Sequence, residues 1–474
     1  MKKAIGAGIA VLAVAGAAAP YLSGMRAETA FRDNLEAISQ NPQLDLELVR
    51  YERSWLGAEA RSELSLVTPD ETIRLGLHHR IHHGPTPVTL ALAEVVTTPE
   101  IPAEHREAFA HYFGDKAPLT VNLRIGLTGA QHVTFASPPY AGPSLNSPET
   151  RIDWQGLTGE AEITRAGDRA TFHLEAPGLD LTGKEANLTL NHLAIDSAFR
   201  KDSEDLWLGK TEVAVEEARL EAPALEAGDG ERLTIEGLRA RQRIEREEAG
   251  DLLRMKGGWE LDRATYGERS LRSAVLALEL RHLDAGTYRK LNRRLRDLHR
   301  QGLSPEEIRS RTAALLEELL PRFLEHSPEL AVTDLAFQAP QGDFQGSARA
   351  RFQAGDRAPD DLLAQPALVL QQVTAQAEAR VAQALLRSLL QAMAADKAAE
   401  MLGPQASGEQ VEQAASRMVE TQIGMARALG FLQADGDHFT AEAEWDQGRV
   451  TINGKPLGLG MGTGAGGPMP PGMP

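Results

Sequence analysis

The chain of 474 residues lacks cysteine and has few aromatic residues, with 12 Phe, 6 Tyr and 5 Trp. The absence of thiols excludes a disulfide scaffold, a zinc–thiolate or iron–sulfur protein, and a cysteine-nucleophile enzyme. Lys and Arg number 50 against 67 Asp and Glu, which gives a formal net charge of −17. Because this surplus of negative charge repels phosphate, we expect no nucleic-acid partner.

Catalytic and cofactor motifs are missing or incomplete. The sequence contains no G-x-S-x-G, H-E-x-x-H or H-x-E…C-x-x-C motif. The segment from Gly178 to Lys184 has the spacing of a phosphate-binding loop, but Glu185 follows it where Mg²⁺ binding requires Ser or Thr. We therefore expect no enzymatic activity and no cofactor.

A histidine cluster is the most plausible candidate for a metal site. It consists of His78, His79, His82 and His83. On a strand, His78 and His82 share a face but lie about 13 Å apart, so one ion cannot bind both unless the strand bends or a neighbouring strand contributes. The pattern favours a solvated strand face, and we expect no metal.

The N-terminus has the features of an export segment. Lys2 and Lys3 precede sixteen uncharged residues, Ala4 to Ala19, and a helix through Leu22 would be about 28 Å long, close to a hydrocarbon core of about 30 Å. Residues 1–24 therefore predict a signal anchor or a signal peptide. Because Pro20 would directly follow cleavage in the alanine run, an uncleaved anchor is favoured. The two lysines place the N-terminus in the cytoplasm, so we expect a single-pass inner-membrane protein with its bulk in the periplasm.

Apolar residues alternate with polar ones from about residue 44 to residue 283. Examples are Leu44, Leu46 and Leu48, then Val121, Leu123, Ile125 and Leu127, and later Val213 and Val215. This period predicts many antiparallel strands with one buried face. A helical insert is expected at 102–113. Because the stretch is too long for one flat sheet, we expect it to curl, and its apolar face could form a groove.

Helical spacing follows residue 283. Asp284 can cap one helix, and Ser304 with Glu307 forms a capping box for the next. Helical inserts are expected at about 284–326 and 382–432, with strands at 330–352, at 369–381 and in a hairpin over 438–453. The Gly/Pro/Met tail, 458–474, cannot bury a core and is expected to be disordered.

The predicted fold is therefore α+β: an N-terminal helix, a long curled antiparallel sheet with helical inserts, and a disordered tail. Its expected parts are the signal segment (1–24), a β-rich part (25–283), an α+β part of the same body (284–457) and the tail (458–474).

Several short motifs together resemble the YdgA-like family, bacterial envelope proteins of unknown function. They include Tyr51-x-Arg53-x-Trp55, then His83-Gly84-Pro85, and near the end Asn453-Gly454-Lys-Pro. Ser54 and Leu56 depart from the Gly and Phe of the family pattern. The resemblance runs from residue 20 to residue 456 and offers no catalytic residues.

These motif residues also have physical interpretations. On a strand, Tyr51, Arg53 and Trp55 share a face, which permits a cation–π contact. The His83-Gly84-Pro85 sequence is typical of a strand end and turn. Asn453-Gly454 fits a tight turn that requires positive φ. All are expected to be structural.

Two functions are compatible with the sequence. The first is a non-catalytic envelope protein that acts by interaction or scaffolding with a protein partner, as the whole-chain resemblance and the absence of catalytic motifs suggest. The alternative is a groove that binds a lipid or another hydrophobic ligand, as the long run of half-apolar strands beside a membrane segment suggests. The apolar or polar character of the concave face distinguishes them.

Overall fold

The computed structural model describes residues 44–457 except 54–56, 68–71, 84–90, 204–205, 223–230, 249, 268, 300, 302, 354–370 and 404–405. The chain divides into two compact units, Met1–Pro328 and Glu329–Pro474. The predicted signal segment (1–24) and the tail (458–474) lie outside the described residues. Within the described part, no helix is long and apolar enough to span a membrane.

The first unit is built on an antiparallel meander. Its strands pair in the following order: β1 (Leu44–Arg53), β2 (Gly57–Val67), β3 (Thr72–His83), β4 (Ala91–Glu100), β5 (Thr120–Gly126), β6 (Gln131–Ser137), β9 (Leu157–Ile163), β10 (Arg169–Thr182), β11 (Asn187–Ser203), β12 (Leu206–Ala222), β13 (Glu231–Arg246), β14 (Leu252–Tyr266) and β15 (Arg269–Asp284). The short strands β7 (Tyr140–Pro143) and β8 (Arg151–Trp154) attach to β10. The predicted antiparallel sheet is thus confirmed.

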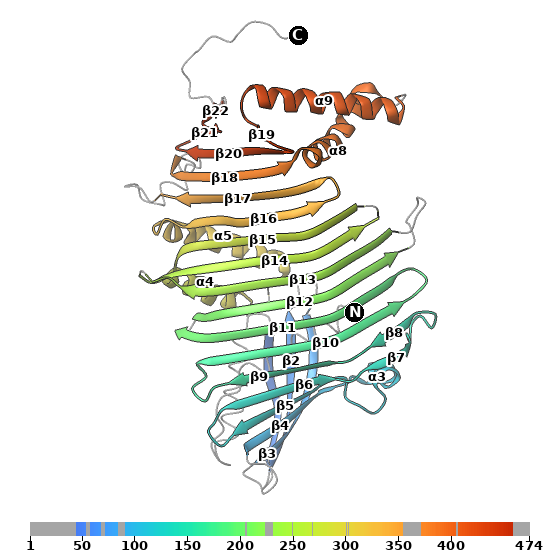
Figure 1. Cartoon of the computed structure of the whole chain (residues 1–474). Coiled ribbons are helices and arrows are strands. Elements are labelled where there is room, and N and C mark those ends of the chain that lie inside the picture. The colour runs from blue at the N-terminus through green and yellow to red at the C-terminus, as the bar shows by residue number, and fades with distance from the viewer. Residues whose placement is uncertain are drawn as a thin grey trace. The chain divides into compact units, whose positions relative to one another are not determined.

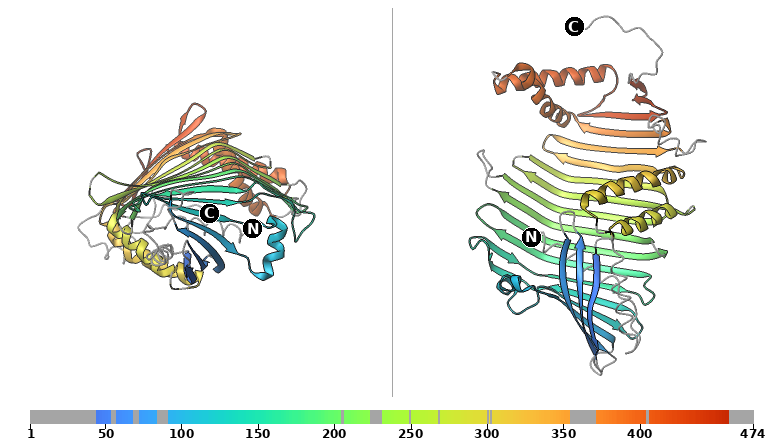
Figure 2. Two further views of the ribbon diagram at one scale, coloured as in Figure 1. Left: turned by 90° about the horizontal axis from the view of Figure 1, so that it is seen from below. Right: turned by 180° about the vertical axis from the view of Figure 1, so that it is seen from behind.

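The sheet of this unit curls (Figures 1 and 2). Strands β10–β15 form a broad arch, and β1–β3 run steeply across its concave side. The helices α4 (Ala285–His299) and α5 (Pro305–Leu324) lie on the same side of the arch. Among the described strands β1 and β15 are not paired, so the curled sheet stays open.

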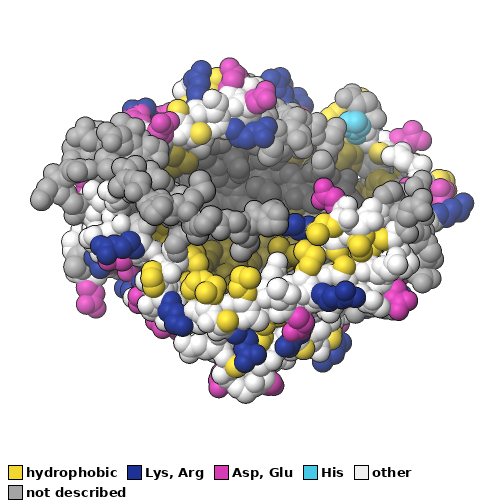
Figure 3. Space-filling view, turned by 90° about the horizontal axis from the view of Figure 1, so that it is seen from above, with side chains coloured by type: hydrophobic (Ala, Val, Ile, Leu, Met, Phe, Trp, Pro, Cys, Tyr) yellow, Lys and Arg dark blue, Asp and Glu magenta, His cyan; other side chains and the backbone are white. Residues whose placement is uncertain are grey.

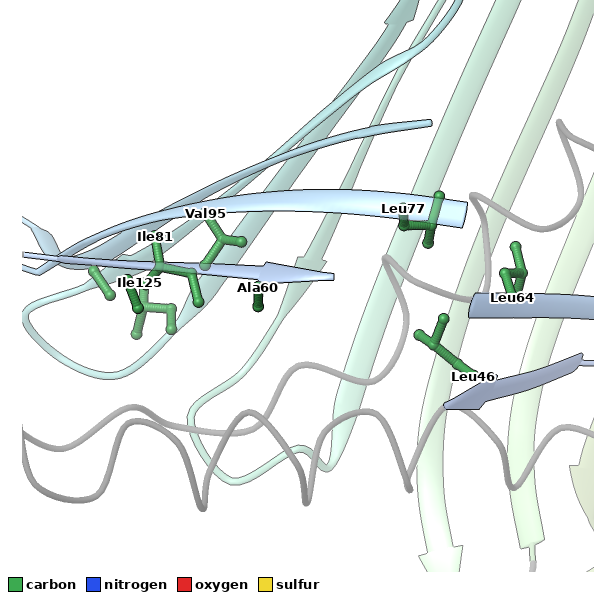
Figure 4. Close-up of a cluster of buried hydrophobic side chains, with 9 residues drawn as sticks. Leu46, Ala60, Leu64, Leu77, Ile81, Val95 and Ile125 are labelled. Carbon is green, nitrogen blue, oxygen red and sulfur yellow. The ribbon is translucent and has the colours of Figure 1, made fainter. Parts of the chain in front are cut away.

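The tightest core of the first unit lies at the β1–β5 end (Figure 4). Alternate residues of these strands point inward and are almost completely buried: Leu46, Ala58, Ala60, Leu64, Leu77, Ile81, Ala93, Val95 and Ile125. Small alanines on β2 and β4 let neighbouring elements approach closely, and leucine and isoleucine fill the remaining space. This is the one-sided burial that the period of two predicts.

The helices begin where their capping residues predict. The Thr287 backbone N–H donates to Asp284 Oδ1 at 2.6 Å at the start of α4. Ser304 and Glu307 form the reciprocal capping box of α5. The helical insert at 102–113 is also confirmed, as a short 3₁₀ turn, η1 (Ala103–His105), that continues into α3 (Arg106–Phe113).

The second unit combines a smaller antiparallel sheet with a helical hairpin. The strands β16 (Glu329–Ala339), β17 (Gly342–Phe352), β18 (Val373–Ala382) and β20 (His438–Asp446) pair in sequence order, followed by β21 (Arg449–Ile452) and β22 (Lys455–Leu457), with β19 (Gln433–Asp435) also beside β20. The hairpin consists of α8 (Gln383–Leu402) and α9 (Gly408–Ala428). The strand predicted at 369–381 is observed as β18, and the helical insert predicted at 382–432 is observed as this hairpin, which ends four residues earlier.

The core of the second unit lies between this hairpin and the sheet. Val419 and Phe439 are its most buried members, and Ala398 and Ala415 bring the two helices together. The predicted division of the body at residues 283 and 284 stays a prediction. The two compact units meet in sequence after α5.

We predict that the β1–β5 core contributes strongly to the stability of the first unit. Ile125→Ala removes a side chain that is 0% exposed, so its free energy of unfolding should fall by about 2–5 kcal/mol. Leu127→Ala, two residues along and 56% exposed, is the matched control and should change it by less than about 0.5 kcal/mol. Chemical unfolding followed by circular dichroism measures both. Equal effects of the two variants would contradict this placement of the core.

Candidate functional site

The two faces of β10–β15 differ sharply in chemistry. Directly paired residues of antiparallel strands share a face, so the register gives the composition of each face. One row across all six strands is almost wholly apolar: Leu174, Ile195, Val213, Ala240, Trp259 and Leu276. The next row on the same side, two residues along each strand, is mixed: Phe172, Ser197, Thr211, Gln242, Gly257 and Leu278. The row after that is again mostly apolar, with Ala170, Phe199, Gly209, Ile244, Met255 and Leu280. We call the side that carries these rows the apolar face.

The opposite side, here the charged face, carries ion pairs. One of its rows reads His173, Asp196, Glu212, Arg241, Gly258 and Ala277. Arg241 lies between two carboxylates, with Nε 3.2 Å from Glu212 and NH1 2.5 Å from Glu260. These cross-strand pairs raise the pKa of the Arg241 guanidinium, mainly through the hydrogen bond to Glu212. The charged face is therefore the solvated side of the arch.

The apolar face is only partly covered. Leu174 is buried, but most of the leucine, isoleucine and valine side chains on β11–β15 are only half-buried. Trp259 is 46% exposed and Phe199 37%. Soluble proteins seldom expose such large apolar side chains in one contiguous area unless the area binds something.

An irregular row crosses the sheet and keeps the apolar residues on one side. His192 in β11, Gly237 in β13 and Ser273 in β15 all have positive φ. The strands keep the same pairing register on both sides of this row, so it is not a β-bulge. The apolar residues on either side of each position are three apart, in the pairs Leu190 and Leu193, Ile235 and Leu238, and Leu271 and Ala274. Beyond the irregular row lies a further row, Ile152, Leu181, Leu188, Leu220, Leu233, Tyr266 and Arg269, which is apolar except at its last member.

Two other elements contact the apolar face at its margins. Phe172 of β10 stacks on Phe135 of β6, with ring centroids 5.7 Å apart. At the end of the arch near α4 and α5, Tyr288 and Phe323 pack on a buried cluster that also touches Met255. Because these contacts place both helices on the apolar face, that face is the concave one (Figure 2).

Figure 3 shows hydrophobic side chains along one wall of a hollow. In the first unit a small cavity is lined almost entirely by apolar groups: Leu64, Leu75, Leu77, Thr97, Pro99, Leu119 and Val121. None of these lining residues belongs to β10–β15, so this cavity is separate from the apolar face.

The histidine cluster is not the solvated strand face that the sequence suggested. His82 is exposed, but His79 is only 2% exposed and lies in the core between β2 and β4. Its Nε2 is 2.7 Å from Ser62 Oγ and its Nδ1 is 2.9 Å from Thr97 Oγ1. The prediction failed for His79 because two hydroxyl groups satisfy the ring inside the core, and spacing along one strand does not reveal those partners. No group of metal-binding side chains occurs among the described residues.

The residues of the resemblance motifs are dispersed over both units. Tyr51 packs against the β1–β5 core, and His83 ends β3, paired with Ala93. The Arg53 side chain and the residues Trp55, Gly84 and Pro85 lie outside the described part, so the cation–π contact stays a prediction.

The last motif, Asn453-Gly454, forms a turn and also makes a tertiary contact. Asn453 and Gly454 both have positive φ and connect β21 to β22. The Asn453 side-chain N–H groups also donate to the carbonyl oxygens of Gly430 and Phe431, at 3.0 and 3.1 Å. This side chain therefore connects the hairpin to the chain that leaves α9, a contact that its sequence position did not predict.

A second histidine emerges only from the structure. His438 at the start of β20 is buried, with Nε2 2.9 Å from Asp343 Oδ1 and Nδ1 2.6 Å from Asp437 Oδ1. The hydrogen bond to Asp343 raises the pKa of His438 and lowers that of Asp343. The three residues are far apart in sequence or lie in a turn, and no motif marks them. The cluster joins β17 to β20 and has a structural role in the second unit.

Comparison with known protein families identifies the chain at the level of a family. A family model described as a bacterial protein of unknown function (DUF945) matches residues 1–459. The chain belongs to this family. No curated protein and no solved structure matches the chain. The match covers the strands that carry the apolar face as well as the helical hairpin. The narrower YdgA-like resemblance stays a prediction.

We predict a pH dependence of stability that originates at His79. Burial, with a smaller contribution from the neighbouring His78, lowers the pKa of His79 from 6.5 to about 4. The unfolded chain takes up this proton near pH 6.5, whereas the folded chain resists it until about pH 4. His79 should therefore contribute full stability above pH 6.5 and progressively lose it, by up to about 3 kcal/mol, as the pH falls to 4.

The measurement is the free energy of unfolding of wild type, His79→Gln and the exposed control His82→Gln at several pH values. His79→Gln should flatten the decline between pH 6.5 and 4, and His82→Gln should keep the wild-type slope. If all three proteins decline in parallel, His79 is not the buried neutral group described here.

Proposed function

We propose that the protein binds hydrophobic ligands of the lipid type on the apolar face of β10–β15. The observation that carries the proposal is the composition of this face. Its central row is almost wholly apolar, it is concave, and Trp259 and Phe199 remain substantially exposed. An alkyl chain laid on it would remove apolar surface on both sides from water, at roughly 25 cal/mol per Å².

The chemistry of the face limits the ligand. Most charged residues of these strands belong to the charged face, where cross-strand ion pairs such as Arg239 with Asp262 engage them. Arg269, paired with Tyr266 at the start of β15, is an exception at the margin of the apolar face. A charged group pressed onto the apolar face would lose its hydration without gaining a partner. Long uncharged chains therefore fit it better than a polar metabolite or a charged peptide.

Location and catalytic status remain part of the proposal. Residues 1–24 support export and attachment to the inner membrane, where lipids are the most abundant hydrophobic molecules. The absence of catalytic motifs supports a binding protein over an enzyme. The interaction or scaffolding role is the second candidate, because a protein segment with an apolar surface could occupy the same face.

We predict that the protein purified without detergent carries lipid. Mass spectrometry of an organic extract should detect it, and the delipidated protein should enhance the fluorescence of N-phenyl-1-naphthylamine, an uncharged probe. Trp259→Glu places a charge in the middle of the apolar face and should weaken probe binding by about tenfold or more.

Thr171→Glu is the matched control. It adds the same charge to an exposed position on the charged face of β10 and should bind the probe like wild type. Folded wild-type protein that carries no lipid and does not bind the probe would overturn the proposal. A stable protein partner recovered in place of lipid would favour the scaffolding role.

A further inference from the structure

The helix α4 is the most basic element of a strongly acidic chain. Its fifteen residues, AGTYRKLNRRLRDLH, contain five Lys or Arg and a single Asp. At 3.6 residues per turn four of these cations gather on one side of the helix: Arg289, Lys290, Arg293 and Arg294. The apolar residues gather on the other: Tyr288, Leu291, Leu295 and Leu298. A basic amphipathic helix of this kind is typical of surfaces that meet anionic lipids.

The position of α4 connects this basic side to the proposed binding face. Tyr288 packs on the cluster that touches Met255 at the margin of the apolar face. Arg289 follows Tyr288 directly. The N-cap at Asp284 and the ion pair between Arg289 and Asp251, at 3.3 Å, fix the helix to the ends of the strands. The fold therefore fixes α4 at the margin of the apolar face, and Lys290 and Arg294 lie beside α5, where both pair with Glu318.

The local charge is not balanced. Lys290 Nζ and Arg294 NH2 both approach the same oxygen of Glu318 on α5, at 3.1 and 3.6 Å. One carboxylate is therefore paired with two cations. The hydrogen bond from Lys290 and the positive charges of Lys290 and Arg294 lower the pKa of Glu318. Arg289 and Arg246 share Asp251, but Arg246 also pairs with Asp202, so these two cations are balanced. An anion that reached Lys290 and Arg294 would meet two cations and one carboxylate in a chain of net −17.

We infer that the ligand is an anionic amphiphile, a lipid with a phosphate headgroup, whose alkyl chains lie on the apolar face and whose headgroup is held by Lys290 and Arg294 of α4. This inference rests on the proposed function and adds the class of headgroup. The chains supply affinity by burial, and the two exposed cations supply selectivity through charge-assisted hydrogen bonds to phosphate oxygens.

The test compares the uptake of two lipids that share the same chains. The delipidated full-length protein is incubated with dioleoyl phosphatidylglycerol or dioleoyl phosphatidylcholine vesicles, and bound lipid is quantified by mass spectrometry after gel filtration. Wild type should take up the anionic lipid about fivefold better at low salt, with a smaller difference at high salt.

Three variants test whether a preference for the anionic lipid depends on α4. Lys290→Gln with Arg294→Gln should abolish the preference, whereas Glu318→Gln, which removes the competing carboxylate, should increase it. Lys210→Gln with Arg243→Gln removes two facing cations from the charged face and should leave it unchanged. Binding of the uncharged N-phenyl-1-naphthylamine should be the same in all of them, because the apolar face is intact.

The outcomes separate this inference from the proposed function. Equal uptake of both lipids by wild type, or a preference that survives Lys290→Gln with Arg294→Gln, would overturn the inference and leave the proposed function standing. No uptake of either lipid and no probe binding would overturn the proposed function itself. Inorganic phosphate that binds the delipidated protein as tightly as the lipid would identify a free-phosphate site and contradict the headgroup assignment.

Discussion

Alternation along antiparallel strands sends neighbouring side chains to opposite sides of a sheet, and the first unit maintains this separation over strands of up to 17 residues. One side collects cross-strand ion pairs such as Arg241 with Glu212 and Glu260. The other collects leucine, isoleucine, valine and aromatic side chains. Because exposure of the apolar side to water is unfavourable, the sheet curls with its apolar side inward.

The curl covers this side unevenly. At the β1–β5 end the inward residues are almost fully buried, with Ile125 at 0% exposure. Across β11–β15 their counterparts are half-exposed, and the packing contacts described above lie at the margins, with Phe135 on one side and with α4 and α5 on the other. The same alternation thus produces a core at one end and an accessible surface at the other. A bound ligand would bury the half-exposed apolar residues of β11–β15, as neighbouring strands bury those of β1–β5.

Much of this architecture follows from local sequence patterns, because strand period and helix caps act over a few residues. The alternation predicted the antiparallel sheet, and Asp284 and Ser304 predicted the starts of α4 and α5. What escaped prediction depends on contacts across the sheet. His79 is buried because Ser62 and Thr97 face it from neighbouring strands, and the Asp343–His438 contact joins residues distant in sequence. The irregular row was missed for a related reason: a step of three at His192 interrupts the period of two within one strand. The aligned positive-φ positions at Gly237 and Ser273 show that the apolar pattern continues across the neighbouring strands.

The absence of cysteine makes the central claim directly measurable, because a single introduced thiol can carry a fluorophore at a chosen site. Phe199→Cys places the fluorophore on the apolar face of β11, and Asp196→Cys places it on the charged face of the same strand. Lipids with brominated chains quench a fluorophore only at close range. The account predicts strong quenching at position 199 and little at position 196. Equal quenching at both positions, or none at position 199 in a folded protein that carries lipid, would contradict it.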